Sequence, residues 1–206
     1  MLLQRIQQQF IDSADLKYQC AQNLAPTVEA AIQAVLASVT GGGKVLACGN
    51  GASAAAAQHF AASFIGRYER ERPELAAMSL SADAAVLSGI ANDFDARAVY
   101  ARQVRALGHA GDVLLALSTS GNSANMVAAV EAAHERDMTV VALTGARGGR
   151  LAQLLRDTDV QVCVPHEVPA RILEVHHLVL HCICDGVDAQ LLGLPDESNT
   201  PMESAP

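Results

Sequence analysis

The sequence is poor in aromatic residues, has no long apolar run and carries few basic side chains. Aromatics make up 3% of the chain and tryptophan is absent, while alanine is abundant, which favours helices packed closely on a sheet over a β-sandwich. No apolar run reaches the ~18 residues of a membrane span. The N-terminus lacks the basic and apolar regions of a secretory signal. We therefore expect a cytoplasmic protein with no membrane partner.

The charge balance and the cysteines exclude further classes of protein. The formal net charge is −8, which disfavours direct binding to polyanionic DNA. A role in nucleic-acid metabolism would therefore act through another protein. The five cysteines are odd in number and irregularly spaced, so they predict no disulfide framework. We interpret them as small buried side chains that stay reduced.

Short apolar segments alternate with helical patterns along most of the chain. The predicted strands are 44–48, 75–80, 113–117, 139–143 and 160–164. The predicted helices are 2–39, 54–65, 83–91, 95–107, 122–136, 148–155 and 169–192. The first of them is predicted to break at 23–27, with Thr27 as the N-cap of its second part. This alternation predicts an α/β fold with a doubly wound, five-stranded, mostly parallel sheet flanked by helices.

Three regions of the chain are predicted to differ in their role. Residues 1–40 form an N-terminal helical segment that serves oligomerisation, and residues 41–194 form the sheet domain. Residues 195–206 form a flexible polar tail. The apolar pair Leu191-Leu192 near the C-terminus is interpreted either as an assembly or partner contact or as a helix end that packs on its own domain.

Two strand ends are rich in glycine and small polar residues, CGNGAS at 48–53 and LSTSGNS at 117–123. Ligands of open α/β sheets bind at the carboxyl ends of strands near the switch point. Each loop leads into a predicted helix, whose free N–H groups, together with hydroxyls and glycine, suit a phosphate. The alternative is that Ser118, Thr119 and Asn122 only cap a helix and shape a turn. Two such loops favour a phosphorylated small ligand.

The stretches CGNGASAAAAQHFAASF and LSTSGNSANMVAAVEAA resemble the two signatures of the sugar isomerase (SIS) domain family. RDMTVVALTG and ARILEVHHLVLHCICD extend this resemblance over nearly the whole chain. The subgroup that it resembles contains phosphoheptose isomerases and DiaA, which associates with the replication initiator DnaA. The resemblance implies a homotetramer with shared sites for a sugar phosphate or another small anion. The implied binding residues are Asn50, Gly51, Ala52, Ser53, Asn92, Asp93, Ser118, Thr119, Ser120 and Ser123.

The catalytic pattern that the resemblance implies is incomplete in this chain. The isomerases interconvert sedoheptulose 7-phosphate and heptose 7-phosphate with a glutamate base and a zinc ion held by two histidines, that glutamate and a glutamine. The histidines fall on His59 and His181, but the glutamate falls on Ser63 and the glutamine on Leu173. Serine is a poor base, and two histidines alone hold zinc weakly.

A second set of polar residues lies on the last predicted helix. Glu174, His177 and His181 are spaced i, i+3 and i+7, which places them along one helical face. They form either an alternative metal site or a polar stripe at a pocket wall or a subunit interface. If the chain is an isomerase, Glu174 and His181 are the candidate catalytic residues.

The two missing side chains favour a DiaA-like protein over an enzyme. In this interpretation the chain is a non-catalytic, phosphosugar-binding SIS protein that needs no cofactor and binds a DnaA-type initiator in DNA replication initiation. The alternative is a phosphoheptose isomerase, which is a sugar-phosphate aldose–ketose isomerase, with an atypical zinc site at His59 and His181. A third possibility is a sugar-phosphate sensor whose partner surface responds to the bound ligand.

Overall fold

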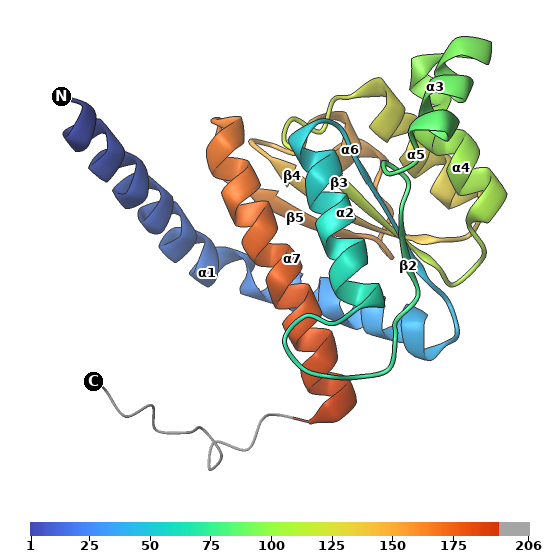
Figure 1. Ribbon diagram of the computed structural model, residues 1–206, viewed down its shortest axis with the longest axis horizontal. Helices are drawn as coiled ribbons and strands as arrows, with labels where there is room; N and C mark the ends of the chain where they lie inside the picture. The colour runs from blue at the N-terminus through green and yellow to red at the C-terminus, as the bar shows by residue number, and fades with distance from the viewer. Residues whose placement is uncertain (194–206) are drawn as a thin grey trace.

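The computed structural model describes residues 1–193 and has three layers, with a parallel sheet between two layers of helices (Figure 1). The predicted tail at 195–206 lies outside the described residues. The strands are β1 (Val45–Gly49), β2 (Ala77–Ser79), β3 (Val113–Ser118), β4 (Thr139–Gly145) and β5 (Val160–Val164). The helices are α1 (Leu2–Thr40), α2 (Ala52–Ile65), α3 (Ala84–Asp93), the 3₁₀ helix η1 (Ala96–Ala98), α4 (Val99–Leu107), α5 (Ala124–Glu135), α6 (Gly149–Leu154) and α7 (Pro169–Leu192).

The sheet has the order β2-β1-β3-β4-β5, and all neighbouring strands run parallel. In this order the direction of winding reverses between β1 and β3, which is the switch point where such folds bind ligands. The predicted doubly wound α/β fold is therefore confirmed. Among residues 1–193, no helix combines the length and the apolar character that crossing a bilayer requires.

Both faces of the sheet are covered by helices. Ala47, Leu115 and Leu143 are buried in one core cluster with residues of α1, α2 and α7. Leu46 and Leu114 are buried in a second cluster with residues of α4, α5 and α6. Because both faces are buried, side chains of both strand faces are apolar, which explains the uniformly apolar strand sequences.

The predicted break in the first helix is wrong. Helix α1 continues through Pro26, and Thr27 Oγ1 donates a hydrogen bond to the Leu24 carbonyl at 2.9 Å instead of capping a second helix. An interior proline costs a helix about 3 kcal/mol. Burial of Leu16 and Val35 on either side of Pro26 offsets this cost, because both pack against the core.

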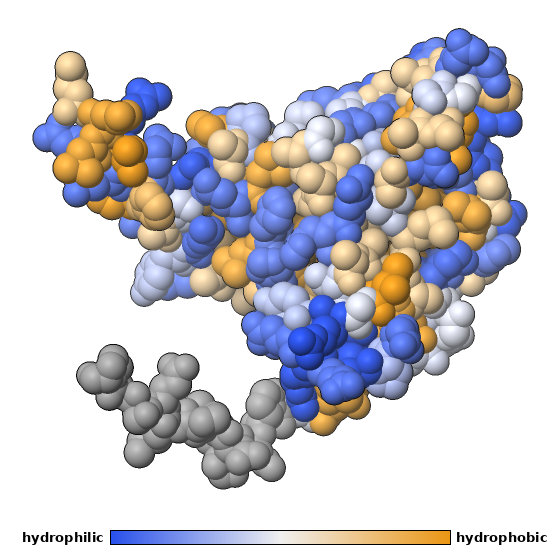
Figure 2. Space-filling view, in the orientation of Figure 1, coloured by the Kyte–Doolittle hydropathy of each residue, from blue (hydrophilic) through white to orange (hydrophobic). Residues whose placement is uncertain are grey.

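The first turns of α1 extend away from the body of the molecule (Figure 1). Leu2, Leu3, Ile6 and Phe10 are exposed there, and Figure 2 shows an apolar patch at this end of the helix. The role of residues 1–40 in assembly stays a prediction, as do the boundaries of the other two regions.

Three smaller differences concern the length of strand β2, the end of helix α3 and the burial of two cysteines. Strand β2 covers Ala77–Ser79 only, because it lies at the edge of the sheet and pairs with β1 alone. Helix α3 continues through Asp93, where a separating loop at 92–94 was predicted. All five cysteines are free, but Cys182 is exposed and Cys163 is half-buried, so the prediction of buried thiols fails for these two.

Candidate functional site

The two glycine- and serine-rich loops lie next to each other at the carboxyl edge of the sheet. Strands β1 and β3 are paired neighbours with Gly49 opposite Leu117, so the loops that follow them emerge side by side. A reciprocal pair of hydrogen bonds joins the loops. Asn50 Nδ2 donates to Asn125 Oδ1 at 2.9 Å, and Asn125 Nδ2 donates to Asn50 Oδ1 at 2.8 Å. Asn125 is not among the residues predicted from the sequence, although it follows directly on the second loop.

The hydroxyls of the loop Ser118–Ser123 shape its turn. Ser118 Oγ accepts a hydrogen bond from the Gly121 N–H at 3.1 Å, and Ser120 Oγ accepts one from the Asn122 N–H at 3.2 Å. Ser123 precedes α5, but its side chain makes no capping bond to the helix. The N–H groups of Met126 and Val127 donate to the Ser123 carbonyl at 3.0 Å, so those of Ala124 and Asn125 are the ones that remain available to an anion.

Gly121 fixes the path of this loop. Its φ is +64°, and a Cβ at this position would lie 1.9 Å from the Gly148 carbonyl oxygen. Two N–H groups of helix α6 donate hydrogen bonds to the loop. The Leu151 N–H donates to the Gly121 carbonyl at 3.0 Å, and the Arg150 N–H donates to Asn122 Oδ1 at 3.0 Å. The loop is therefore held in its shape by the chain itself.

The first loop is held from the other side by Tyr100 of α4. The buried Tyr100 hydroxyl donates to the Gly49 carbonyl and lies 3.3 Å from Asn50 Oδ1. Burial raises the pKa of Tyr100, so the hydroxyl stays protonated. Ser53, one of the predicted contact residues, is buried in the first turn of α2. Tyr100 is also absent from the predicted residues, because nothing in its local sequence marks it.

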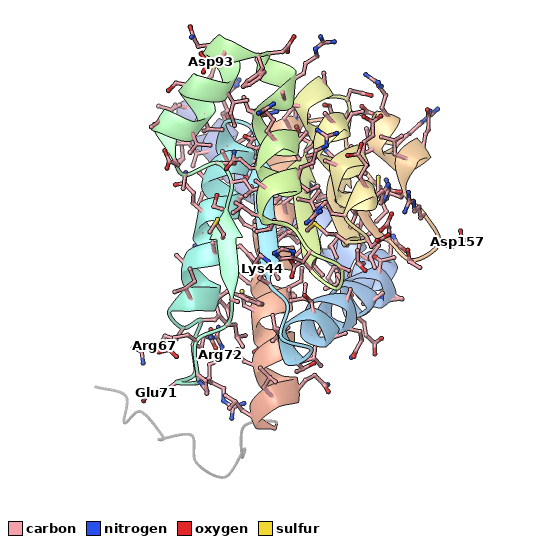
Figure 3. All side chains as sticks on the ribbon, turned by 90° about the vertical axis from the view of Figure 1, so that its right-hand side faces the viewer. Lys44, Arg67, Glu71, Arg72, Asp93 and Asp157 are labelled. Atoms are coloured by element: carbon pink, nitrogen blue, oxygen red, sulfur yellow. The ribbon has the colours of Figure 1, made fainter. Side chains whose placement is uncertain are left out.

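Two of the predicted contact residues, Asn92 and Asp93, lie on α3 rather than on either loop. Asn92 and Asp93 lie exposed at the end of α3, where Asn92 Nδ2 donates to Asp93 Oδ1 at 2.8 Å. Figure 3 shows Asp93 at the opposite end of the molecule from Arg67, Glu71 and Arg72. No hydrogen bond among residues 1–193 joins this pair to either loop.

A group of histidines lies between α2 and α7. The Nε2 atoms of His59 and His181 are 2.9 Å apart, and their ring centres are 5.1 Å apart. The ring of His177 is centred 6.1 Å from that of His59. Burial lowers the pKa of His59, and the neighbouring His181 and His177 lower it further. His59 is therefore neutral at physiological pH.

Helix α7 is anchored to the sheet next to these histidines. The fully buried His176 places Nε2 2.9 Å from the Thr144 carbonyl, at the end of β4. Burial lowers the pKa of His176 to about 4, so a neutral ring donates this bond. The contact fixes α7 relative to the carboxyl edge of the sheet.

The zinc ligands that the family resemblance implies are only half present. Ser63 is buried and its Oγ donates to the His59 carbonyl at 3.0 Å, so it offers no carboxylate. Leu173 has no donor atom. No three histidine, cysteine, aspartate or glutamate side chains of the described residues are already placed to hold a metal ion. The residues present do not fit the implied set of two histidines, a glutamate and a glutamine.

Glu174 has partners on both carboxylate oxygens. Ser13 Oγ of α1 donates to Oε2 at 2.6 Å, and the Arg171 guanidinium lies 2.6 Å from Oε1. Glu174 nevertheless lines an open cavity of about 490 Å³ whose other lining residues are Lys17, Leu173, His177, Leu178 and His181. The predicted polar face of α7 therefore borders one cavity.

The fold agrees with comparisons to known proteins. The chain matches the SIS domain family over residues 9–145 and belongs to that family. Within it, the chain belongs to the phosphoheptose isomerase subgroup. It is 62% identical to the phosphoheptose isomerase of Methylibium petroleiphilum, over 95% of this chain and 98% of that protein.

Solved structures support the same assignment. Phosphoheptose isomerase GmhA from Neisseria gonorrhoeae matches with a TM-score of 0.88 and 48% identity, covering 92% of this chain and all of that one. A phosphoheptose isomerase from Francisella tularensis matches with a TM-score of 0.86 and 38% identity, over 91% and 98% of the two chains.

These matches overturn the DiaA-like interpretation and its initiator partner in DNA replication. Relatives that align along nearly the whole chain are phosphoheptose isomerases. The DiaA-like interpretation gave too much weight to Ser63 and Leu173. Two changed side chains affect the chemistry of one site. Identity along the whole chain includes the core and the loops, and it therefore identifies the subgroup.

Proposed function

We propose that the chain is a phosphoheptose isomerase, an aldose–ketose isomerase that acts on sedoheptulose 7-phosphate. The observation that carries this proposal is the high identity to phosphoheptose isomerases along nearly the entire chain. The two strand-end loops at the switch point support it, because they retain the small side chains and free N–H groups that a phosphate requires.

In this proposal the phosphate lies on the loop Ser118–Ser123 and the first turn of α5. The backbone N–H groups and the hydroxyls of Thr119 and Ser123 donate to its oxygens. Asn50 and the N-terminal turn of α2, with Gly51, Ala52 and Ser53, contact the sugar or the phosphate. The proposed ligand is thus bound by dipoles and hydroxyls rather than by a strongly basic patch.

Isomerisation moves a proton between neighbouring carbons, so a base must lie within hydrogen-bond reach of the sugar. We assign this role to Glu174. It lines the cavity beside His177 and His181, and Ser13 and Arg171 hold its carboxylate in one orientation. Each carboxylate oxygen retains a further lone pair. Ser63 is excluded as the base because a hydroxyl has no useful basicity without an activating group.

We further propose a homotetramer in which neighbouring chains complete each site. The exposed apolar end of α1 supports this arrangement. Asn92 and Asp93 support the same arrangement, because both side chains are exposed on α3 and are accessible to a neighbouring chain.

The test is turnover of sedoheptulose 7-phosphate by the purified chain, with Glu174→Gln compared against Glu167→Gln. We expect measurable turnover by the parent. Loss of the base lowers kcat by about 10²- to 10⁴-fold with a smaller change in KM, because the phosphate contacts are untouched. Glu167 is exposed in the loop before α7, so its variant keeps parental activity.

A parent chain without turnover contradicts the proposed function. A Glu174→Gln variant with parental kcat leaves the function in place but assigns the proton transfer to another residue.

A further inference from the structure

We propose that Arg72 is a positioning residue for the isomerase, and that its buried ion pair with Asp188 sets the spacing of helices α2 and α7. This spacing determines how His59 of α2 meets His181 of α7, beside the cavity that Glu174 lines. The inference rests on the proposed function, because it assigns a role in turnover to two residues that do not themselves line the cavity.

Arg72 lies on the loop between α2 and β2, and its guanidinium bonds to both helices (Figure 3). Nε donates to Asp188 Oδ1 of α7 at 2.5 Å. Nη2 donates to the Ser63 carbonyl and Nη1 to the Phe64 carbonyl, both at 2.9 Å. Carbonyls in the last turn of a helix have no partner within that helix. Arg72 therefore joins the end of α2 to a fixed point on α7.

The two anchor points lie near the histidines along their helices. Asp188 follows His181 by about two helical turns, which places both on one face of α7. Ser63 lies one turn after His59, and its Oγ donates to the His59 carbonyl at 3.0 Å. Among residues 1–193, the contact between the Nε2 atoms of His59 and His181 is the only hydrogen bond that joins α2 directly to α7. The bridge through Arg72 is thus the second polar link between these helices.

Stability alone does not explain why this ion pair is buried. The side chains of Arg72 and Asp188 are 0% and 2% exposed. Asp188 Oδ2 is buried and has no hydrogen-bond partner within the described part of the chain. The attraction of a buried pair repays its removal from water only when further hydrogen bonds satisfy the remaining lone pairs, and Asp188 does not meet this condition. The pair instead provides direction, because the donors of a guanidinium have a fixed planar geometry.

The rest of the contact between α2 and α7 is apolar. Phe60 and Phe64 of α2 are buried in one cluster with Leu180 and Cys184 of α7. Apolar contacts are not directional, so they bring the two helices together without fixing their exact offset. A misplacement of about 1 Å between reacting groups can lower a rate about 10²-fold. We therefore infer that the polar bridge at Arg72 sets the offset that turnover needs.

The test removes the pair from the full-length chain in two ways. Arg72→Met leaves the charge of Asp188 buried without a partner, whereas Arg72→Met with Asp188→Leu removes both charges. We expect the double variant to recover part of the melting temperature that the single variant loses. We expect kcat to stay about 10²-fold below the parent in both, with little change in KM, because the strand-end loops are untouched.

Arg72→Lys is the conservative variant. Its ammonium keeps a charge beside Asp188 but lacks the planar fork that reaches one carboxylate and two carbonyls at once. We expect it to melt above Arg72→Met and still to have the lowered kcat. Arg105→Gln with Glu135→Gln is the matched control, because it removes an exposed ion pair between α4 and α5. This control should keep the parental kcat and melting temperature.

Crystal structures of the parent and of Arg72→Lys give a readout that needs no turnover. We expect the Nε2 atoms of His59 and His181 to move beyond the hydrogen-bond distance of about 3.2 Å in the variant. A folded double variant with parental kcat, a kcat that falls only with the folded fraction, or an unchanged histidine distance overturns the proposal. A parent without turnover whose histidines separate in Arg72→Lys loses the proposed function and keeps the positioning role of Arg72.

Discussion

At the scale of single residues, the loop Ser118–Ser123 depends most on Gly121. The positive φ of this glycine and its close approach to the Gly148 carbonyl leave no space for a side chain. Its N–H also donates to Ser118 Oγ. A change at Gly121 therefore moves both the hydroxyl beside it and the start of α5 that follows.

We expect Gly121→Ala to lower the free energy of unfolding by at least about 2 kcal/mol, from backbone strain and the contact with Gly148. We also expect sedoheptulose 7-phosphate to raise the melting temperature of the parent but not of the variant, since a ligand stabilises only a state that binds it. Urea and thermal unfolding measure both effects.

Gly42→Ala is the matched control for this substitution. Gly42 has a φ of +82°, but no atom lies within 4 Å of the position that an added Cβ would occupy. The Gly42→Ala variant therefore measures the loss in free energy of unfolding that a positive φ causes by itself. Equal losses in the two variants would mean that the contact with Gly148 contributes nothing.

At the scale of elements, Asp112 joins the start of β1 to the start of β3. Its carboxylate accepts hydrogen bonds from the Lys44 N–H at 2.9 Å, the Lys44 ammonium at 2.6 Å and the His109 N–H at 2.9 Å. Burial raises the pKa of Asp112. Burial is outweighed by hydrogen bonds from the Lys44 side chain and from the His109 and Lys44 N–H groups, and by the charge of Lys44. The pKa of Asp112 therefore lies below its ordinary value of 3.8.

The sign of the pH dependence follows from this lowered pKa. The folded state binds a proton at Asp112 less readily than the unfolded chain does. The stabilisation is therefore complete above the unfolded pKa and is lost as the pH falls through the lower folded pKa. Asp112→Asn is expected to reduce the free energy of unfolding by about 1 to 3 kcal/mol at neutral pH.

Urea unfolding of parent and variant at neutral pH and near pH ~3 checks this prediction, and the difference between them should shrink in acid. Glu135→Gln is the control, because Glu135 pairs with Arg105 at an exposed position and such pairs stabilise little. A difference for Asp112→Asn that does not depend on pH contradicts the assignment to its charge.

Several elements could be predicted from the sequence because local pattern decides them. β5 and α7 have the predicted bounds, since a short apolar run and a long helix that begins at Pro169 are clear local signals. The helix through Pro26 could not be predicted, because burial of α1 against the sheet overrides a local breaker.

The site was predictable only in part for the same reason. The loop Ser118–Ser123 is visible as a motif. Asn125 and Tyr100 instead contact Asn50 of the first loop, which depends on the pairing of β1 with β3 and on the packing of α4. The sequence shows His177 and His181 on one helical face, but only the packing of α2 against α7 places His59 beside them.

At the scale of the whole molecule, the exposed apolar start of α1 predicts assembly. Ile6→Ser combined with Phe10→Ser is expected to shift a tetramer towards smaller species, because both exposed side chains lose their apolar contact area. Analytical ultracentrifugation measures the change. Gln4→Ser with Gln7→Ser alters exposed polar positions of the same turns and should leave the mass unchanged. Equal masses for both variants contradict this role of α1.

The amide pair between Asn50 and Asn125 also has a consequence for how the two positions evolve. Each side chain donates one hydrogen bond to the other and accepts one from it, so a change at either position removes both bonds at once. A lineage that altered only one of them would separate the two loops. Among descendants of this chain, the two positions are therefore expected to be retained together or replaced together.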